Sequence, residues 1–131
     1  MTRPSELRVR HKAQPRSASL LRHALDAFLV ANEIDSDTRI DIITAVGEAI
    51  ANSIEHAYAP NKVGDVELRA RISDIEPRIA VDIIDGGRFV PRAPRPLGGF
   101  GLRIIKTAAR TMRIDTGAGT AVRLEFDSAR A

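Results

Sequence analysis

The sequence contains no cysteine and no tryptophan, and aromatic residues make up only 4% of its 131 residues. Without cysteine, the chain can form neither a disulfide nor a thiolate metal site. Because aromatic side chains are scarce, we expect no platform on which single-stranded nucleic acid could stack. The hydrophobic content of 44% suits one domain with its own core, and we predict a single domain over residues 1–131.

Long apolar runs and a strong charge of one sign are also missing. The N-terminal segment MTRPSELRVRHK has no apolar stretch long enough for a signal peptide or a membrane span, so we expect a cytoplasmic protein that does not contact membranes. The net charge is only +3, although the pI is about 9.9, and the basic residues are scattered along the chain. Direct binding to nucleic acid is therefore not predicted.

Glu48, Asn52 and His56 follow one another at four-residue spacing in the segment TAVGEAIANSIEHAY. On an α-helix this spacing places all three side chains along one face. A carboxylate one turn before a carboxamide combines a candidate general base with a neutral oxygen ligand for Mg²⁺. A solvated helix face explains the three residues equally well. The opposite face is predicted to pack in the core through Ile43, Val46, Ile50, Ile54 and Ala57.

The run AVDIIDGG at residues 80–87 is rich in β-branched side chains and ends in an aspartate and two glycines. It predicts a buried strand that enters a turn. At the mouth of such a strand, the Asp85 carboxylate can accept a hydrogen bond from the exocyclic amine of adenine, whereas guanine would oppose a carbonyl oxygen to it. The segment alone fits a simple Asp-Gly turn between strands at least as well.

Two glycine-containing segments follow this strand. LGGFGLRIIKTAAR at 97–110 places Gly98, Gly99 and Gly101 before an amphipathic helical pattern, where backbone N–H groups can approach an anion at a helix N-terminus. Gly119-Thr120 opens the alternating run TAVRLEF, which predicts a closing strand. The chain has no Walker A loop and no complete dinucleotide fingerprint, so both common phosphate-loop folds are set aside.

The remaining elements follow from hydrophobic periodicity and from helix start and stop signals. Helices are predicted from Pro15 or Ser17 to about Asn32, from a cap at Ser36 or Asp37 to Pro60, and from about residue 99. Strands are predicted at Leu7–Lys12, 64–73, 78–85, 112–117 and 120–126.

Taken in order, these motifs resemble those of the GHKL ATPases, whose nucleotide site is the Bergerat fold. The order is Glu-x-x-x-Asn, then Asp-x-Gly, then a glycine-rich loop before a helix, and finally Gly-Thr before the last strand. The segments GEAIANSIEHAY and GGFGLRII, on so short a chain, look most like those of the anti-sigma factor serine kinases of bacterial partner-switching systems. The resemblance covers roughly residues 5–127. It implies an α+β fold, a two-layer sandwich in which three helices cover one face of a mixed, mainly antiparallel sheet.

The resemblance also implies a role for each motif. Glu48 corresponds to the catalytic base, and Asn52 to the Mg²⁺ ligand. His56 is expected to pack and hydrogen-bond near the strands rather than to take part in catalysis. Adenine is expected at Asp85 and Thr120, and the phosphates along the glycine-rich loop. The full set of implied nucleotide contacts is Asn52, Asp85, Gly87, Gly98, Gly99, Gly101, Leu102 and Thr120.

By the same resemblance, the cofactors are ATP and Mg²⁺, and the reaction is phosphoryl transfer to a serine or threonine of an anti-anti-sigma protein with a STAS domain. The second partner is a sigma factor, which a homodimer of this chain is expected to hold inactive. The chain departs from the family at Phe89, where a second glycine is usual, and the lid RFVPRAPRPL carries three stiffening prolines. Two alternatives stay open. One is an ATP-gated binding module without kinase activity, and the other is a histidine-kinase catalytic domain that acts on a separate chain.

Overall fold

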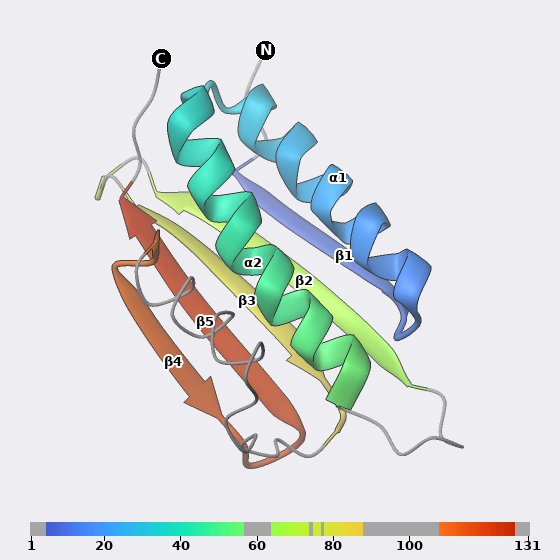
Figure 1. Ribbon diagram of the computed structural model, residues 1–131. Coiled ribbons are helices and arrows are strands. Elements are labelled where there is room, and N and C mark those ends of the chain that lie inside the picture. Colours follow the sequence, from blue (N-terminus) through green and yellow to red (C-terminus); the bar gives the residue numbers. More distant parts are fainter. Residues whose placement is uncertain (1–4, 57–63, 74, 77, 88–107, 128–131) are drawn as a thin grey trace, which may run out of the picture.

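The computed structural model describes residues 5–56, 64–73, 75–76, 78–87 and 108–127. The elements of this part are β1 (Glu6–Lys12), α1 (Pro15–Ala31), α2 (Ser36–His56), β2 (Asp65–Ser73), β3 (Arg78–Asp85), β4 (Thr111–Asp115) and β5 (Thr120–Asp127). Both helices cover the same face of the sheet (Figure 1). The predicted two-layer α+β arrangement is confirmed. The predicted third helix, from about residue 99, falls mostly outside the described residues.

Every pair of neighbouring strands in the described sheet is antiparallel, in the order β1-β2-β3-β5-β4. This differs from the mixed sheet that we expected. Two consecutive strands can pair in parallel only if the connection between them returns the chain to the end of the sheet where the first strand began. A single helix makes such a connection. Here two helices separate β1 from β2, so the chain reverses once more and β2 runs antiparallel to β1 (Figure 1).

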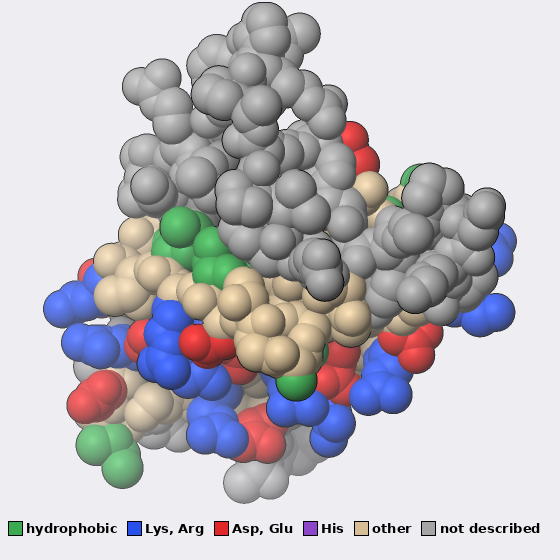
Figure 2. All heavy atoms as spheres, turned by 90° about the horizontal axis from the view of Figure 1, so that it is seen from below, with side chains coloured by type: hydrophobic (Ala, Val, Ile, Leu, Met, Phe, Trp, Pro, Cys, Tyr) green, Lys and Arg blue, Asp and Glu red, His purple; other side chains and the backbone are tan. Residues whose placement is uncertain are grey.

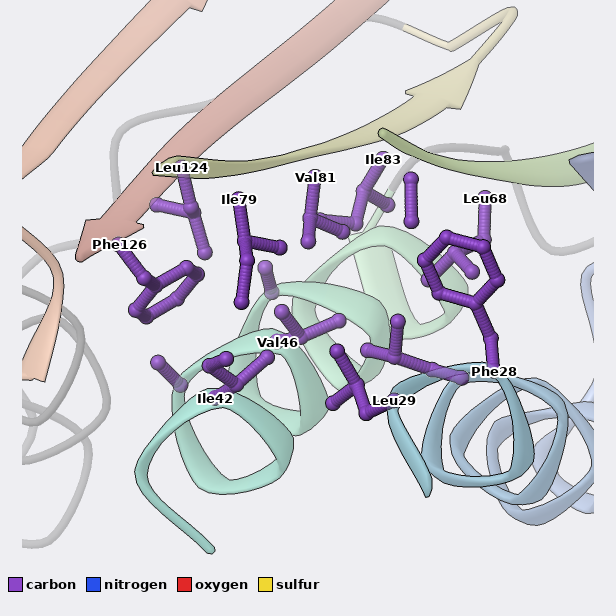
Figure 3. Packing of buried hydrophobic residues seen from close by; sticks show 14 of the residues in the cluster. Phe28, Leu29, Ile42, Val46, Leu68, Ile79, Val81, Ile83, Leu124 and Phe126 are labelled. Carbon is purple, nitrogen blue, oxygen red and sulfur yellow. The ribbon is translucent and has the colours of Figure 1, made fainter. Parts of the chain in front are cut away.

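The core lies between the helices and the sheet (Figure 3). Phe28 and Leu29 of α1 and Val46 of α2 point toward apolar side chains of the strands. Those side chains, each at most 3% exposed, are Leu68, Ile79, Val81, Ile83, Leu124 and Phe126. Buried and half-buried residues alternate along the whole of β3, and Asp85 takes the last buried position. Because alternate residues of a strand face the same side, Asp85 lies on the helix-covered face.

The buried side of α2 is wider than the predicted stripe and is displaced from it. Ile42 is completely buried, whereas its neighbour Ile43 and also Ile54 are only half-buried. The reason is that α2 packs against α1 as well as against the sheet. The wider buried side includes a polar residue, Ser53, which is 8% exposed. Ala57, also assigned to the stripe, lies outside the described residues.

Asp35 caps α2, so the prediction of a cap at Ser36 or Asp37 is wrong. The Asp35 carboxylate accepts hydrogen bonds from the Thr38 backbone N–H at 2.8 Å and from the Thr38 hydroxyl at 3.1 Å. These hydrogen bonds hold the pKa of the Asp35 carboxyl below its ordinary value. Pro60, predicted to end the helix, lies outside the part of the chain that the structure describes.

The face of the sheet away from the helices carries charged residues. Glu67 of β2 lies there between core residues of the opposite face, and it is 5% exposed. Its carboxylate accepts hydrogen bonds from Arg8 Nε at 2.8 Å, Arg69 Nε at 2.7 Å and Arg10 at 3.4 Å. The hydrogen bond from Arg8, assisted by Arg69, lowers the pKa of Glu67. Three arginines thus compensate one buried acid.

Seen from below, basic and acidic side chains are interleaved on the molecule (Figure 2). They are not gathered into a stripe of one sign on this side of the described residues, in line with the scattered arginines of the sequence. No helix among those residues has the length and apolar character needed to cross a membrane.

Candidate functional site

Asp85, at the end of β3, is buried, and each oxygen of its carboxylate accepts a hydrogen bond. Oδ2 accepts a hydrogen bond from the Ser53 hydroxyl of α2 at 2.6 Å, and Oδ1 accepts one from the Gly87 backbone N–H at 2.9 Å. Both donors are neutral, and no cation within the described ranges contacts this carboxylate. Since a carboxylate can accept about four hydrogen bonds, roughly two positions remain for other donors.

Thr120 opens β5 directly opposite Asp85 in the antiparallel register, and it is also buried. Its hydroxyl donates a hydrogen bond to the Gly87 carbonyl oxygen at 3.3 Å. Gly119, just before it, has a φ of 84°, and a Cβ at this position would overlap the carbonyl oxygen of Asp85 and lie 3.0 Å from Gly86 Cα. Only glycine allows this close approach. The turn between β4 and β5 therefore packs directly on the backbone at the end of β3.

Glu48 and Asn52 lie one turn apart on α2, as predicted. Glu48 is half-buried and Asn52 is exposed, and neither side chain bonds to another residue that the structure describes. Ser53 follows Asn52 directly and is bonded to Asp85. The same turn of α2 thus connects the polar pair to the buried carboxylate. The side chain of His56, at the end of this helix, lies outside the description.

The sequence matches the histidine kinase-like ATPase domain family over residues 11–126. The chain belongs to this family. An anti-sigma F factor of Caldanaerobacter subterraneus is 32% identical, and the alignment covers 91% of this chain and 90% of that protein. The serine-protein kinase RsbW of Bacillus subtilis is 27% identical, with coverages of 84% and 78%.

Among solved structures, that of the RsbU and RsbW domains of a Mycobacterium tuberculosis protein has a TM-score of 0.79 to this ATPase domain. Its sequence identity is 24%, and the match covers 98% of this chain but only 34% of that chain. The similarity shows a shared fold. The present chain spans about a third of the longer protein.

The structure brings together three of the residues that the sequence assigned to the nucleotide site. Asp85, Gly87 and Thr120 are linked by hydrogen bonds and by the register of β3 and β5. Of the other predicted contacts of this ATPase domain, Asn52 lies on α2 next to Ser53. Gly98, Gly99, Gly101 and Leu102 lie outside the described residues, and so do Phe89 and the rest of the lid.

Sequence reasoning missed Ser53, and Gly119 was noted only as the start of a strand. A signal for Ser53 exists in the spacing of α2, because small residues recur every four positions on its buried side, at Ala45, Ala49 and Ser53. A serine in such a series needs a hydrogen-bond partner, since an unpaired buried hydroxyl is costly. The partner is Asp85.

No group of three or more potential protein ligands for a metal ion occurs within the described ranges. Mg²⁺ usually keeps several waters and is bound through one or two protein ligands together with substrate phosphates. Asn52 is exposed and bonds to no other residue that the structure describes, and its carboxamide oxygen is a neutral hard ligand of the kind that Mg²⁺ accepts.

Proposed function

We propose that this chain is an anti-sigma factor with ATP-dependent protein serine/threonine kinase activity. It binds Mg-ATP, phosphorylates an anti-anti-sigma protein with a STAS domain, and sequesters a sigma factor as a homodimer. The observation that carries the proposal is the Asp85 carboxylate at the end of a strand in a member of an ATPase family. It is buried, and its two hydrogen bonds from described residues both come from neutral donors. The relatives named anti-sigma F factor and serine-protein kinase RsbW support the partner class and the reaction.

At the adenine end, Asp85 accepts a hydrogen bond from the exocyclic amine at C6 of the base. Guanine carries an oxygen at that position, so two acceptors would oppose each other in a buried site. Thr120 and Gly87 complete this end of the site, since both lie against the Asp85 turn. Selectivity for ATP over GTP follows from this arrangement.

At the phosphate end, Glu48 and Asn52 act from α2. Asn52 would hold Mg²⁺ through its carboxamide oxygen, and the ion would supply neutralisation of charge on the phosphates. Glu48 takes the proton from the partner's hydroxyl while that oxygen bonds to the γ-phosphorus. The bond to the β–γ bridging oxygen breaks, and ADP leaves. The phosphates themselves are assigned to Gly98, Gly99, Gly101 and Leu102, as the motifs predict.

The test is phosphotransfer with the purified chain, Mg²⁺, γ-labelled ATP and STAS-domain proteins of the source organism. Phosphoserine or phosphothreonine on one of them, followed by its dissociation, supports the proposal. Phosphohistidine supports a histidine-kinase activity instead. A STAS-domain or sigma-factor partner that binds in an ATP-dependent manner but never gains phosphate supports the ATP-gated binding module, to which Phe89 and the proline-rich lid would be suited.

Glu48→Gln identifies the base in the same assay. The variant keeps size and polarity, so nucleotide binding should persist while phosphotransfer falls by roughly 10²–10⁴-fold. Asp41→Asn is the matched control, because Asp41 is an exposed carboxylate of the same helix. It should leave both quantities unchanged. Equal losses of binding and stability in Glu48→Gln would show that Glu48 has a structural role and that the catalytic assignment is wrong.

A further inference from the structure

We propose that Ser53 is a positioning residue that sets the adenine selectivity of the site, because its hydroxyl fixes the orientation of the Asp85 carboxylate. The inference rests on the proposed function, which places adenine at Asp85. It adds a residue to the site that neither the sequence motifs nor the comparisons assign.

The hydrogen bond between the two side chains is short and shielded from solvent. The Ser53 Oγ to Asp85 Oδ2 distance is 2.6 Å, and the two residues are 8% and 6% exposed. This distance is typical of a hydroxyl that donates to an ionised carboxylate. Such a hydrogen bond is about twice as strong as one between neutral groups. Little water can compete for the donor at such low exposure.

Ser53 and Gly87 together determine the plane of the carboxylate. The Gly87 N–H holds Oδ1 and the Ser53 hydroxyl holds Oδ2, so rotation about the Cβ–Cγ bond would break at least one of the two bonds. The nearby Thr120 hydroxyl donates to the Gly87 carbonyl oxygen. Without Ser53, the carboxylate therefore has one anchor, and its free lone pairs no longer point in one fixed direction.

The identity of residue 53 also points to this role. Ala49 and Ala45 occupy the equivalent buried positions one and two turns earlier on α2. Serine is less favourable than alanine inside a helix, and burying its hydroxyl carries a further cost unless it is bonded. The bond to Asp85 offsets both costs, and a pre-oriented acceptor is what a site needs to distinguish a base with an amine from one without.

Calorimetric titration with Mg²⁺ can test this by comparing ATP with purine riboside triphosphate, which has hydrogen in place of the 6-amino group. Wild-type chain should bind ATP roughly 10- to 100-fold more tightly than the analogue, the worth of one hydrogen bond to a charged group. In Ser53→Ala this ratio should shrink by about 3- to 10-fold, because a hydrogen bond to a less fixed acceptor is weaker. In this variant the affinity for ATP should decrease, whereas the affinity for the analogue should change little.

Ser17→Ala is the matched control. Ser17 is a buried serine of the other helix, and its hydroxyl donates to the Lys12 carbonyl oxygen. This variant also loses the hydrogen bond of a buried serine, yet the ratio between ATP and the analogue should stay at the wild-type value. Ser53→Cys, which is close in size but a weaker donor, should give an intermediate ratio even if Ser53→Ala does not fold.

Two results would overturn the inference in distinguishable ways. If a Ser53 variant weakens ATP and the analogue equally, the ratio is unchanged and Ser53 only supports the shape of the site, while the adenine assignment stands. If the wild-type chain binds ATP and the analogue equally, or binds neither, the assignment of adenine to Asp85 fails. With equal binding, the role of Ser53 falls while ATP binding stands; with no binding of either nucleotide, the proposed function falls as well.

Discussion

Glu67 and Asp85 are buried carboxylates on opposite faces of the same sheet, and the protein surrounds them differently. Glu67, on the face away from the helices, accepts hydrogen bonds from three arginines. Asp85, on the helix-covered face, accepts hydrogen bonds from a hydroxyl and a backbone N–H and from no other group in the described part of the chain. Burying a charge without a counter-ion is costly, so such a charge is retained where a ligand uses it. Glu67 thus bonds to neighbouring arginines across the sheet, whereas Asp85 keeps acceptor positions for the adenine that we propose.

The largest expected effect comes from the turn that packs on the Asp85 side. Gly119→Ala should lower the free energy of unfolding by about 2–4 kcal/mol, because the added Cβ meets backbone and the φ of 84° is unfavourable for alanine. Gly117→Ala is the control, since nothing lies within 4 Å of a Cβ at that position. Urea unfolding measures both. Similar losses for the two variants would contradict the close approach of Gly119 to β3.

The next largest effect is expected when Asp85 and Glu67 are each replaced by the corresponding amide and the affinity for Mg-ATP is measured. Asp85→Asn should weaken ATP binding by about 1.5–3 kcal/mol, since the acceptor of a charged hydrogen bond is replaced by a neutral group that can also donate. Glu67→Gln should change the affinity by less than about 0.5 kcal/mol. Calorimetric titration with Mg-ATP provides the comparison. Comparable losses of affinity would mean that the two acids do not differ in function.

Stability should show the complementary effect for Glu67. At neutral pH, Glu67→Gln should lower the free energy of unfolding by about 1–2 kcal/mol, because hydrogen bonds from arginine to a charged acceptor are lost. The pKa of Glu67 is lowered in the folded state from an ordinary value of 4.5, so the unfolded chain takes up the proton first. The contribution is therefore complete above about pH 5 and is lost as the pH falls through the lowered pKa. Unfolding curves of the wild-type chain and of Glu67→Gln between neutral and acidic pH would check this. A difference in the free energy of unfolding that persists at the lowest pH would contradict the stabilising role of the charged Glu67 carboxylate.

The smallest effect is expected at an exposed ion pair of the same face. Arg123 donates to both Asp82 oxygens, at 2.7 and 2.9 Å, but its side chain is 52% exposed. Arg123→Ala should therefore cost only about 0.2–1 kcal/mol, and less at about 1 M salt, where screening is strong. Thermal unfolding at two salt concentrations measures the difference. A loss as large as that of Glu67→Gln would show that burial does not distinguish the two clusters.

Features encoded in neighbouring residues could be predicted from the sequence. The β-branched run before Asp85 predicted a strand with the carboxylate at its end, and Gly119-Thr120 predicted the start of the strand that pairs with it. The cap of α2 was predicted less well, because Asp35, Ser36 and Asp37 are three successive residues that all cap helices readily. Only the geometry of Thr38 decides between them.

Features that depend on distant partners could not be predicted. Ser53 and Asp85 are 32 residues apart, and Glu67 and Arg8 are 59 apart. Each pair requires a strand register or a helix rotation that no local pattern specifies. Glu67 occupies an outward position in a strand, where an acid is normally solvated, yet it is 5% exposed and bonds to arginines of β1 and β2.

The order of elements along the chain also has a consequence for how the protein is made. Both helices precede four of the five strands, and β1 pairs with a strand that follows both of them. During synthesis at roughly 5–20 residues per second, the apolar sides of α1 and α2 emerge several seconds before β5 can cover them. We expect nascent chains halted just after α2 to bind chaperones and to be cleaved readily by protease, whereas chains extended through β5 should resist. Equal resistance of both lengths would show that the helical pair is protected before the sheet exists.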